Sequence, residues 1–118
     1  MLTEQRARTL AAEWIDAWNR HDLDAILVHY AEAVEFTSPF VVRLLDDLTG
    51  TVRGKAALRE YFARGLGAYP DLRFELLQVL VGVNSVTVYY RSVGNRLAAE
   101  VMELDAQGQV VRVLAHYA

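Results

Sequence analysis

The hydrophobic residues near the start of the chain recur with the period of an α-helix. Leu10, Trp14 and Trp18 are each four positions apart, so they share one face of a helix predicted over residues 3–19. Thr3 precedes this pattern and is the expected N-cap, because its hydroxyl can accept a hydrogen bond from a free backbone N–H. The sequence therefore predicts an amphipathic helix that buries both tryptophans.

A second helical pattern follows the polar segment 19–21. Asp22 is its expected N-cap, and the helix is predicted to run to about residue 32 with Ile26 and Tyr30 inward. Residues 34–38 then alternate and stop at Pro39, which predicts a short strand ended by proline.

The middle of the chain combines an irregular segment and a third helix. Residues 40–53 are the least regular stretch and too apolar for a solvated loop, so we expect them to form a hydrophobic lid or contact a partner. A third helix is predicted to begin at residues 54–55 and to end before Pro70.

The second half of the chain has the character of β-strands. Four segments are predicted, separated by turn residues such as those at 105–108: residues 72–83, 85–93, 96–104 and 109–117. Helices followed by consecutive strands predict an α+β domain. The strands carry apolar residues on both faces, so the sheet is expected to contact the helices on one side and a second copy of the chain on the other.

Composition narrows the class of protein. The chain has 118 residues, of which 53% are hydrophobic and 23% charged, so a single domain over 1–118 is expected. The formal net charge of −3 argues against nucleic acid as a partner. Cysteine is absent, which excludes disulfides and thiolate ligands. The chain shows no secretory signal and no membrane-spanning run, so we expect a cytoplasmic protein with no membrane partner.

Three segments carry a resemblance to a known family. HDLDAILVHYAEAVEFTSPF (21–40), GKAALREYFARGLGAYPD (54–71) and AAEVMELDAQGQVVRVLAHY (98–117) resemble the nuclear transport factor 2-like superfamily, in its SnoaL-like and ketosteroid-isomerase-like branch. The resemblance implies a cone-shaped half-barrel, in which three N-terminal helices cover a curved, mainly antiparallel sheet. It implies a pocket between helices and sheet, and dimerisation through the sheet's outer face. The fold hosts isomerases, cyclases, dehydratases and non-catalytic modules, so it does not fix the function.

The resemblance also allows the residues of this chain to be compared with those that ketosteroid-isomerase chemistry requires. That chemistry uses a carboxylate base, a tyrosine and a protonated acid. Ser38 stands at the position of the base, and Trp14 at that of the tyrosine. Glu100 matches the acid, Tyr30 matches a supporting tyrosine on the second helix, and Phe62 replaces a further hydroxyl. The base and the tyrosine are therefore not retained.

Glu100 is the first candidate catalytic residue. It shares a strand face with Ala98 and Met102, and the resemblance turns this face toward the pocket. Burial among apolar side chains would raise the pKa of its carboxyl, which suits an acid or base. The alternative interpretation is a structural ion pair with Arg91 or Arg112.

His29 is the second candidate, as a general base opposite Glu100. The alternative interpretation of His29 is a half-exposed side chain hydrogen-bonded to a carbonyl.

The three histidines of the chain lack the spacing of metal ligands, so no metal is predicted, and no cofactor is expected. The residues predicted to line the substrate pocket are Trp14, Trp18, Tyr30, Phe36, Ser38, Phe62, Ala98, Met102 and Tyr117.

Two functions remain open from the sequence. One is an enzyme that acts on a small hydrophobic cyclic molecule by cofactor-free acid–base chemistry of the isomerase, cyclase or dehydratase type. The other is a non-catalytic module for ligand binding or dimerisation. A carboxyl in an apolar pocket serves either function.

Overall fold

The computed structural model describes residues 1–118 as four α-helices, one short 3₁₀ turn and six strands. Their bounds are α1 (Glu4–Asn19), α2 (Leu23–Leu27), β1 (Tyr30–Thr37), α3 (Pro39–Leu45), β2 (Thr51–Arg53), α4 (Lys55–Ala68), β3 (Glu75–Val81), β4 (Ser85–Arg91), η1 (Val93–Asn95), β5 (Leu97–Leu104) and β6 (Val110–Tyr117).

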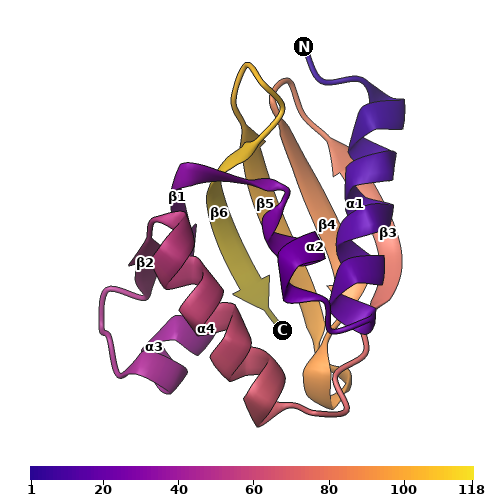
Figure 1. Ribbon diagram of the computed structural model, residues 1–118. Coiled ribbons are helices and arrows are strands. Elements are labelled where there is room, and N and C mark those ends of the chain that lie inside the picture. Colours follow the sequence, from indigo (N-terminus) through magenta and orange to yellow (C-terminus); the bar gives the residue numbers. More distant parts are fainter.

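The six strands form one curved, unclosed sheet in the order β2-β1-β6-β5-β4-β3. Strands β1 and β6 pair in parallel, and every other neighbouring pair is antiparallel. Helix α1 packs on β3 and α4 packs on β1, and Figure 1 shows α1, α2 and α4 on the same side of the sheet. The predicted α+β fold with a cone-shaped half-barrel is confirmed, with four helices in place of three.

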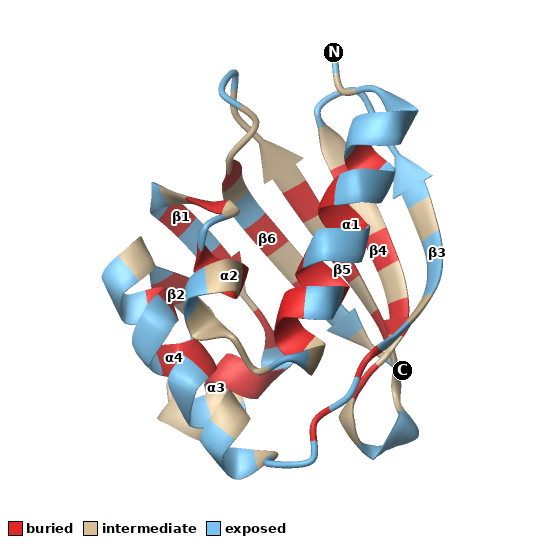
Figure 2. Cartoon of the chain, turned by 45° about the vertical axis from the view of Figure 1, so that its right-hand side comes forward, coloured by how far each residue is buried: buried red, intermediate tan, exposed pale blue.

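Burial alternates along the central strands, as expected for a sheet with one covered face. On β4, Val86, Val88 and Tyr90 are buried, and on β5 the same is true of Glu100 and Met102. The residues between them are only partly buried (Figure 2). The helices therefore enclose one face of β4 and β5, and the core lies between these two layers.

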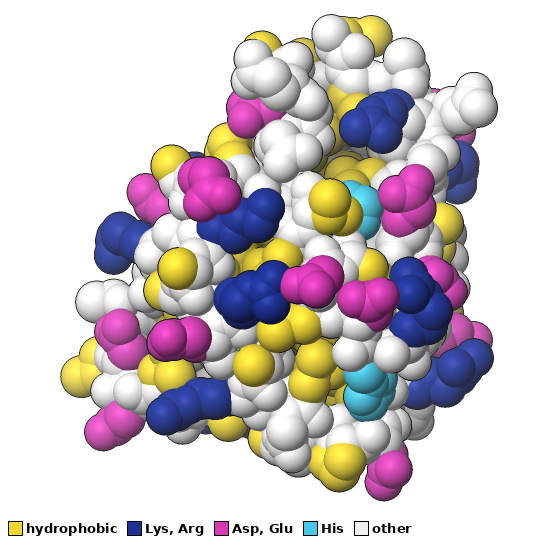
Figure 3. Space-filling view, in the orientation of Figure 1, with side chains coloured by type: hydrophobic (Ala, Val, Ile, Leu, Met, Phe, Trp, Pro, Cys, Tyr) yellow, Lys and Arg dark blue, Asp and Glu magenta, His cyan; other side chains and the backbone are white.

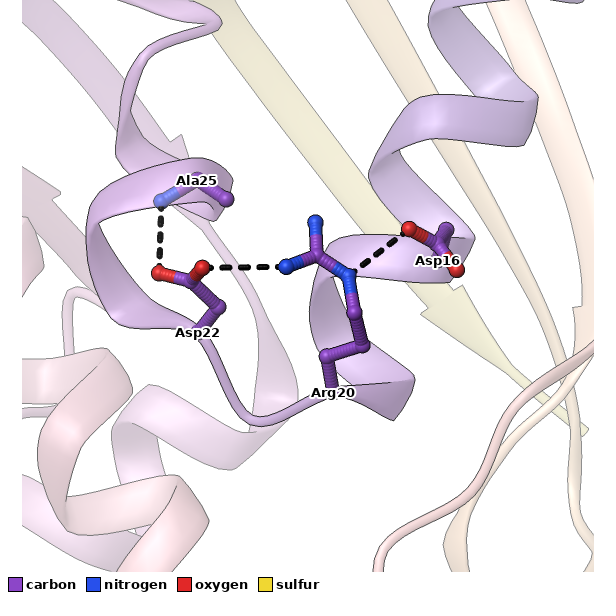
Figure 4. A network of polar contacts seen from close by, with 4 residues as sticks. All are labelled: Asp16, Arg20, Asp22 and Ala25. Atoms are coloured by element: carbon purple, nitrogen blue, oxygen red, sulfur yellow. Dashed lines mark hydrogen bonds and ion pairs between the residues drawn. The ribbon is translucent and has the colours of Figure 1, made fainter.

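Polar side chains fix the start of the chain's first two helices. Thr3 caps α1, and Asp22 caps α2 by accepting a hydrogen bond from the Ala25 backbone N–H at 3.1 Å. Arg20 joins the two helices, because its Nε lies 2.8 Å from Asp16 and its Nη1 3.0 Å from Asp22 (Figure 4). Both predicted caps are confirmed.

The predicted length of the second helix is wrong. Helix α2 ends at Leu27, and β1 begins at Tyr30. Tyr30 pairs with Val110 of β6, and the Val110 N–H donates to the His29 carbonyl at 2.8 Å. Alanine and glutamate in this segment favour a helix locally, but pairing with a strand eighty residues away in the sequence outweighs that propensity.

The segment predicted to be irregular contains α3 and β2. Ser38 caps α3 by accepting from the Phe40 N–H at 3.2 Å, and Pro39 occupies the first helical turn, where its missing N–H costs nothing. Asp46 ends the helix in a left-handed conformation with φ 53°. Gly54 precedes α4 with φ 90°, a conformation that explains glycine at this position.

Charged side chains of both signs lie next to each other over the helical layer (Figure 3). One ion pair joins Asp24 near the start of α2 to Arg59 of α4.

The four predicted β segments are confirmed as β3 to β6, each shorter than expected at one or both ends. No helix combines the length and the apolar character that a membrane crossing requires.

Candidate functional site

A small aromatic cavity of about 60 Å³ lies between the helices and the sheet. Thirteen of its sixteen lining residues are hydrophobic. The lining residues are Trp14, Trp18, Phe36, Phe40, Leu44, Tyr61, Phe62, Gly65, Tyr69, Leu72, Phe74, Tyr90, Ser92, Val93, Glu100 and Tyr117. They come from α1, α3, α4, the sheet and the connecting loops, so only the tertiary fold assembles the site.

The aromatic rings of the lining pack mainly edge to face. Trp18 and Phe62 have ring centroids 4.9 Å apart, and Phe62 lies 5.3 Å from Phe36. Phe40 and Tyr117 lie 4.7 Å apart. Such arrangements are the favoured ones for aromatic pairs, so the cavity has well-packed apolar walls.

Glu100 is the charged residue of this lining, and it is 2% exposed. Its Oε2 accepts a hydrogen bond of 3.0 Å from the Tyr90 hydroxyl. The ion-pair alternative is wrong, because Arg91 pairs with Glu75 and Arg112 pairs with Glu103. Without a cationic partner, desolvation dominates and raises the pKa of Glu100 to about 7, although the Tyr90 hydrogen bond acts against this shift.

Three tyrosines of the cavity lining lie near enough to this carboxyl to be affected by its charge. Burial is the main cause that raises the pKa of Tyr61, Tyr90 and Tyr117 well above the ordinary value, and the nearby Glu100 contributes to each shift. The Ser38 hydroxyl acts in the opposite direction on Tyr61 and Tyr117. These tyrosines therefore stay protonated at neutral pH and can serve as hydrogen-bond donors, while Glu100 is the group that titrates there.

Trp14 does not offer its indole N–H to the cavity. Its Nε1 donates to the Tyr30 hydroxyl at 2.9 Å in the buried interior. Tyr30 belongs to β1 and not to the second helix, and it is not among the lining residues. The two residues form an internal hydrogen bond that joins α1 to the sheet.

His29 is not brought to the cavity. It lies between α2 and β1, partly buried, and does not belong to the lining. Desolvation lowers its pKa, Glu13 opposes this shift, and Arg6 adds to it. Since both charged neighbours are on α1 outside the lining, the structure does not place His29 opposite Glu100 as an acid–base pair.

The other predicted residues divide into two groups. Trp14, Trp18, Phe36, Phe62, Glu100 and Tyr117 line the cavity, whereas Ser38, Ala98 and Met102 are buried beside it without lining it. Sequence reasoning did not predict the other ten lining residues, which are Phe40, Leu44, Tyr61, Gly65, Tyr69, Leu72, Phe74, Tyr90, Ser92 and Val93. Period two could have placed Tyr90 on the inner face with Val86 and Val88, whereas the residues of α4 and its following loop depend on how these elements meet α1.

The cavity adjoins a wider outer groove of about 830 Å³, formed by residues 68–75 and 91–95. The two share Tyr69, Leu72, Phe74, Ser92 and Val93. The five shared residues form the rim of the cavity on this side, here called its mouth.

Two polar residues, one at the end of α1 and one just after it, form hydrogen bonds to the backbone of the loop at the mouth. The Asn19 side chain donates to the Phe74 carbonyl at 2.9 Å and accepts from the Phe74 N–H at 2.6 Å. His21 Nε2 lies 2.9 Å from the Leu72 carbonyl. The loop that narrows the cavity is thus tied to the same helix that carries both tryptophans.

Comparison with known proteins identifies the family. The SnoaL-like domain profile matches residues 11–118. The chain belongs to the SnoaL-like family. A SnoaL-like protein of unknown function from Burkholderia thailandensis is 46% identical, with a TM-score of 0.95 over 98% of this chain and 97% of that one. No curated protein matches the sequence.

More distant SnoaL-like and cyclase-like structures share the fold. A proposed isomerase of the SnoaL-like family from Agrobacterium tumefaciens has 16% identity and a TM-score of 0.78 over 97% of this chain and 98% of that one. SalBIII, an epoxide hydrolase/cyclase-like enzyme of pyran ring formation in the polyether salinomycin, has 23% identity and a TM-score of 0.78 over 100% and 95%. Structures of an NTF2-like protein and of a proposed ketosteroid isomerase match with TM-scores of 0.73 and 0.71, so the expected relationship to that group is confirmed as a relationship of fold.

Proposed function

We propose that this SnoaL-like protein binds a small hydrophobic cyclic molecule in its aromatic cavity and moves a proton on it, with Glu100 as the acid–base group. The observation that supports this most directly is a buried carboxyl in an apolar cavity with a tyrosine hydroxyl as its partner and no cation. A general acid or base works best when its pKa is near the working pH. The pKa of Glu100, about 7, meets that condition.

The site fits acid–base catalysis by a single titrating residue, Glu100. The other ionisable residues of the lining are tyrosines, and those around Glu100 stay protonated because burial raises their pKa values. One carboxylate is enough to take a proton from carbon and return it, or to donate a proton to an oxygen that leaves or closes a ring. Isomerisation, cyclisation and dehydration are therefore the reaction types that fit this site.

Proton exchange on a simple ketone tests the proposal. 1-Indanone is flat and apolar, and its C2 protons are acidic because the carbonyl stabilises the enolate. In D₂O the Glu100 carboxylate would take a C2 proton, exchange it with solvent, and return a deuteron to the same carbon. We expect the protein to accelerate deuterium incorporation, measured by NMR, with a rate that rises with pH through a midpoint near 7.

Glu100→Gln is the decisive variant, because glutamine keeps an acceptor for Tyr90 but carries no exchangeable acid. Its exchange rate should fall to that of buffer. Glu103→Gln is the matched control on the same strand, since Glu103 pairs with Arg112 on the other face and does not line the cavity. Exchange that persists in Glu100→Gln would contradict the acid–base role. Binding without exchange in the wild type would favour a binding module instead.

We also propose that the outer face of the sheet pairs two copies of the chain. Thr87, Val101 and Leu114 are in register across β4, β5 and β6 on the face that no helix covers. Val101 and Leu114 are apolar and only partly buried there, and exposed apolar patches mark interaction surfaces. Sedimentation velocity should give a dimer for the wild type and a monomer for Val101→Arg, and a monomeric wild type would overturn this proposal.

A further inference from the structure

Trp18 carries the one buried side-chain polar atom that lacks a hydrogen-bond partner, its indole Nε1. The side chain is 7% exposed and lines the cavity from the last turn of α1. An unpaired buried donor is unfavourable, because it has lost its hydrogen bond to water and gained none in return. Because native proteins keep such groups rare, each one calls for an explanation, and an acceptor supplied by a ligand is one.

The surroundings of Trp18 explain why the protein supplies no acceptor. Its ring packs 4.9 Å from Phe62, 5.5 Å from Phe74 and 6.1 Å from Trp14, all measured between centroids. These neighbours are aromatic and present no oxygen. The nitrogen itself has almost no solvent-accessible area, so it has no contact with bulk water.

Trp14 provides an internal comparison one helical turn earlier. It is a tryptophan on the same helix and lines the same cavity, yet its Nε1 donates to the Tyr30 hydroxyl at 2.9 Å. The fold has thus satisfied one of the two indoles and left the other without a partner. The free donor is Trp18, and not the residue that stands at the position of the isomerase tyrosine.

We propose that Trp18 Nε1 donates a hydrogen bond to an oxygen of the bound molecule and so selects flat apolar rings that carry a carbonyl or phenolate oxygen. An indole N–H can only donate, so it recognises an acceptor oxygen and rejects an ammonium or other donor-only group. The surrounding rings contact the apolar body of such a molecule. This inference rests on the proposed function, and it names the class of ligand and the atom that orients it.

The size of the cavity adds one requirement to this proposal. A volume of about 60 Å³ is well below the roughly 300–1,000 Å³ usual for a cavity that holds a small organic molecule. The ligand must therefore displace side chains at the mouth, such as Leu72 and Phe74, which line both the cavity and the outer groove. Widening the cavity on that side would also uncover Trp18, whose ring packs against Phe74.

Paired ligands with and without the oxygen test the assignment. 1-Indanone and indane have the same fused rings, and only the ketone carries an acceptor. We expect the wild type to bind 1-indanone about tenfold more tightly than indane, as one hydrogen bond to a buried donor provides. Trp18→Phe removes the N–H and keeps an aromatic ring, so it should lose most of this tenfold preference. Isothermal titration calorimetry measures both constants.

Tyr89→Phe is the control, because Tyr89 lies on the outer face of β4 and does not line the cavity. It should keep the preference for the ketone. The melting temperature of the free protein gives a second readout. Trp18→Phe should lower the melting temperature less than Trp14→Phe does, because it removes a donor that has no partner.

The outcomes separate this inference from the proposed function. If Trp18→Phe retains the tenfold preference, the role of Trp18 is overturned, while loss of deuterium exchange in Glu100→Gln would still support the acid–base site. If neither compound binds the wild type, the cavity is not a site for such rings, and the role of Trp18 and the proposed function are both overturned.

Discussion

The Tyr90 hydroxyl donates a hydrogen bond of 3.0 Å to Glu100 Oε2, and this bond joins neighbouring strands of the sheet. In the register of β4 and β5, Tyr90 lies opposite Ala98 and Glu100 lies opposite Val88. The two residues are therefore diagonal neighbours on the inner face. This arrangement places a titrating carboxyl and a permanent donor together in an apolar cavity.

The stability of the protein should depend on pH through Glu100. Its folded pKa of about 7 lies above the ordinary 4.5, so the unfolded chain releases this proton first as pH rises. The contribution of the protonated carboxyl is present below pH 4.5, declines between pH 4.5 and about 7, and is constant above that. We expect a loss of about 3 kcal/mol across this window.

Glu100→Gln isolates this effect, because other groups titrate equally in both proteins. The difference in unfolding free energy between the wild type and the variant, from urea titrations at several pH values, should shift in favour of the variant between pH 4.5 and 7. A difference that does not vary with pH would show that Glu100 titrates normally.

Removing the partner of Glu100 should move its titration upward. The Tyr90 hydrogen bond lowers the pKa of Glu100 against the effect of burial. Tyr90→Phe keeps the ring packed against Trp14 and Phe74 but deletes the hydroxyl. The midpoint of the protonated-carboxyl infrared band, or of deuterium exchange, should then lie at a higher pH than in the wild type. An unchanged or lower midpoint would contradict the assigned hydrogen bond.

The bond between Trp14 and Tyr30 should contribute to folding and not to ligand choice. Trp14→Phe leaves the buried Tyr30 hydroxyl without its donor, and we expect destabilisation of about 1–3 kcal/mol from this loss, in addition to lost packing. A double-mutant cycle with Tyr30→Phe separates the two contributions. Coupling energy close to zero would show that the bond has no net effect on stability.

Asn19 should control the rigidity of the cavity mouth. Its amide makes two hydrogen bonds to the backbone of Phe74, at 2.9 and 2.6 Å. Asn19→Ala removes both and should lower the unfolding free energy by about 1–3 kcal/mol. It should also speed hydrogen exchange of the Phe74 amide. Asn19→Asp is an informative control, because it retains the acceptor for the Phe74 N–H and loses only the donor.

The sequence alone predicted elements whose signals are local. The four-residue spacing of Leu10, Trp14 and Trp18 predicted α1, and Thr3 was predicted as its N-cap. Alternation of apolar residues predicted the four C-terminal strands. It also predicted that Glu100 shares a strand face with Met102, and both residues are buried in the structure. Helical and strand periods depend on neighbours within a few positions, so they can be seen in the chain itself.

The tertiary structure decided which partners these side chains meet. Pairing with β6 made Tyr30 part of a strand although its neighbours favour a helix. Strand register brought Tyr90 to Glu100, and the packing of α1 satisfied the indole of Trp14 while leaving that of Trp18 free. Burial and hydrogen-bond partners arise from residues distant in sequence, and they set the pKa of a carboxyl and the availability of a donor.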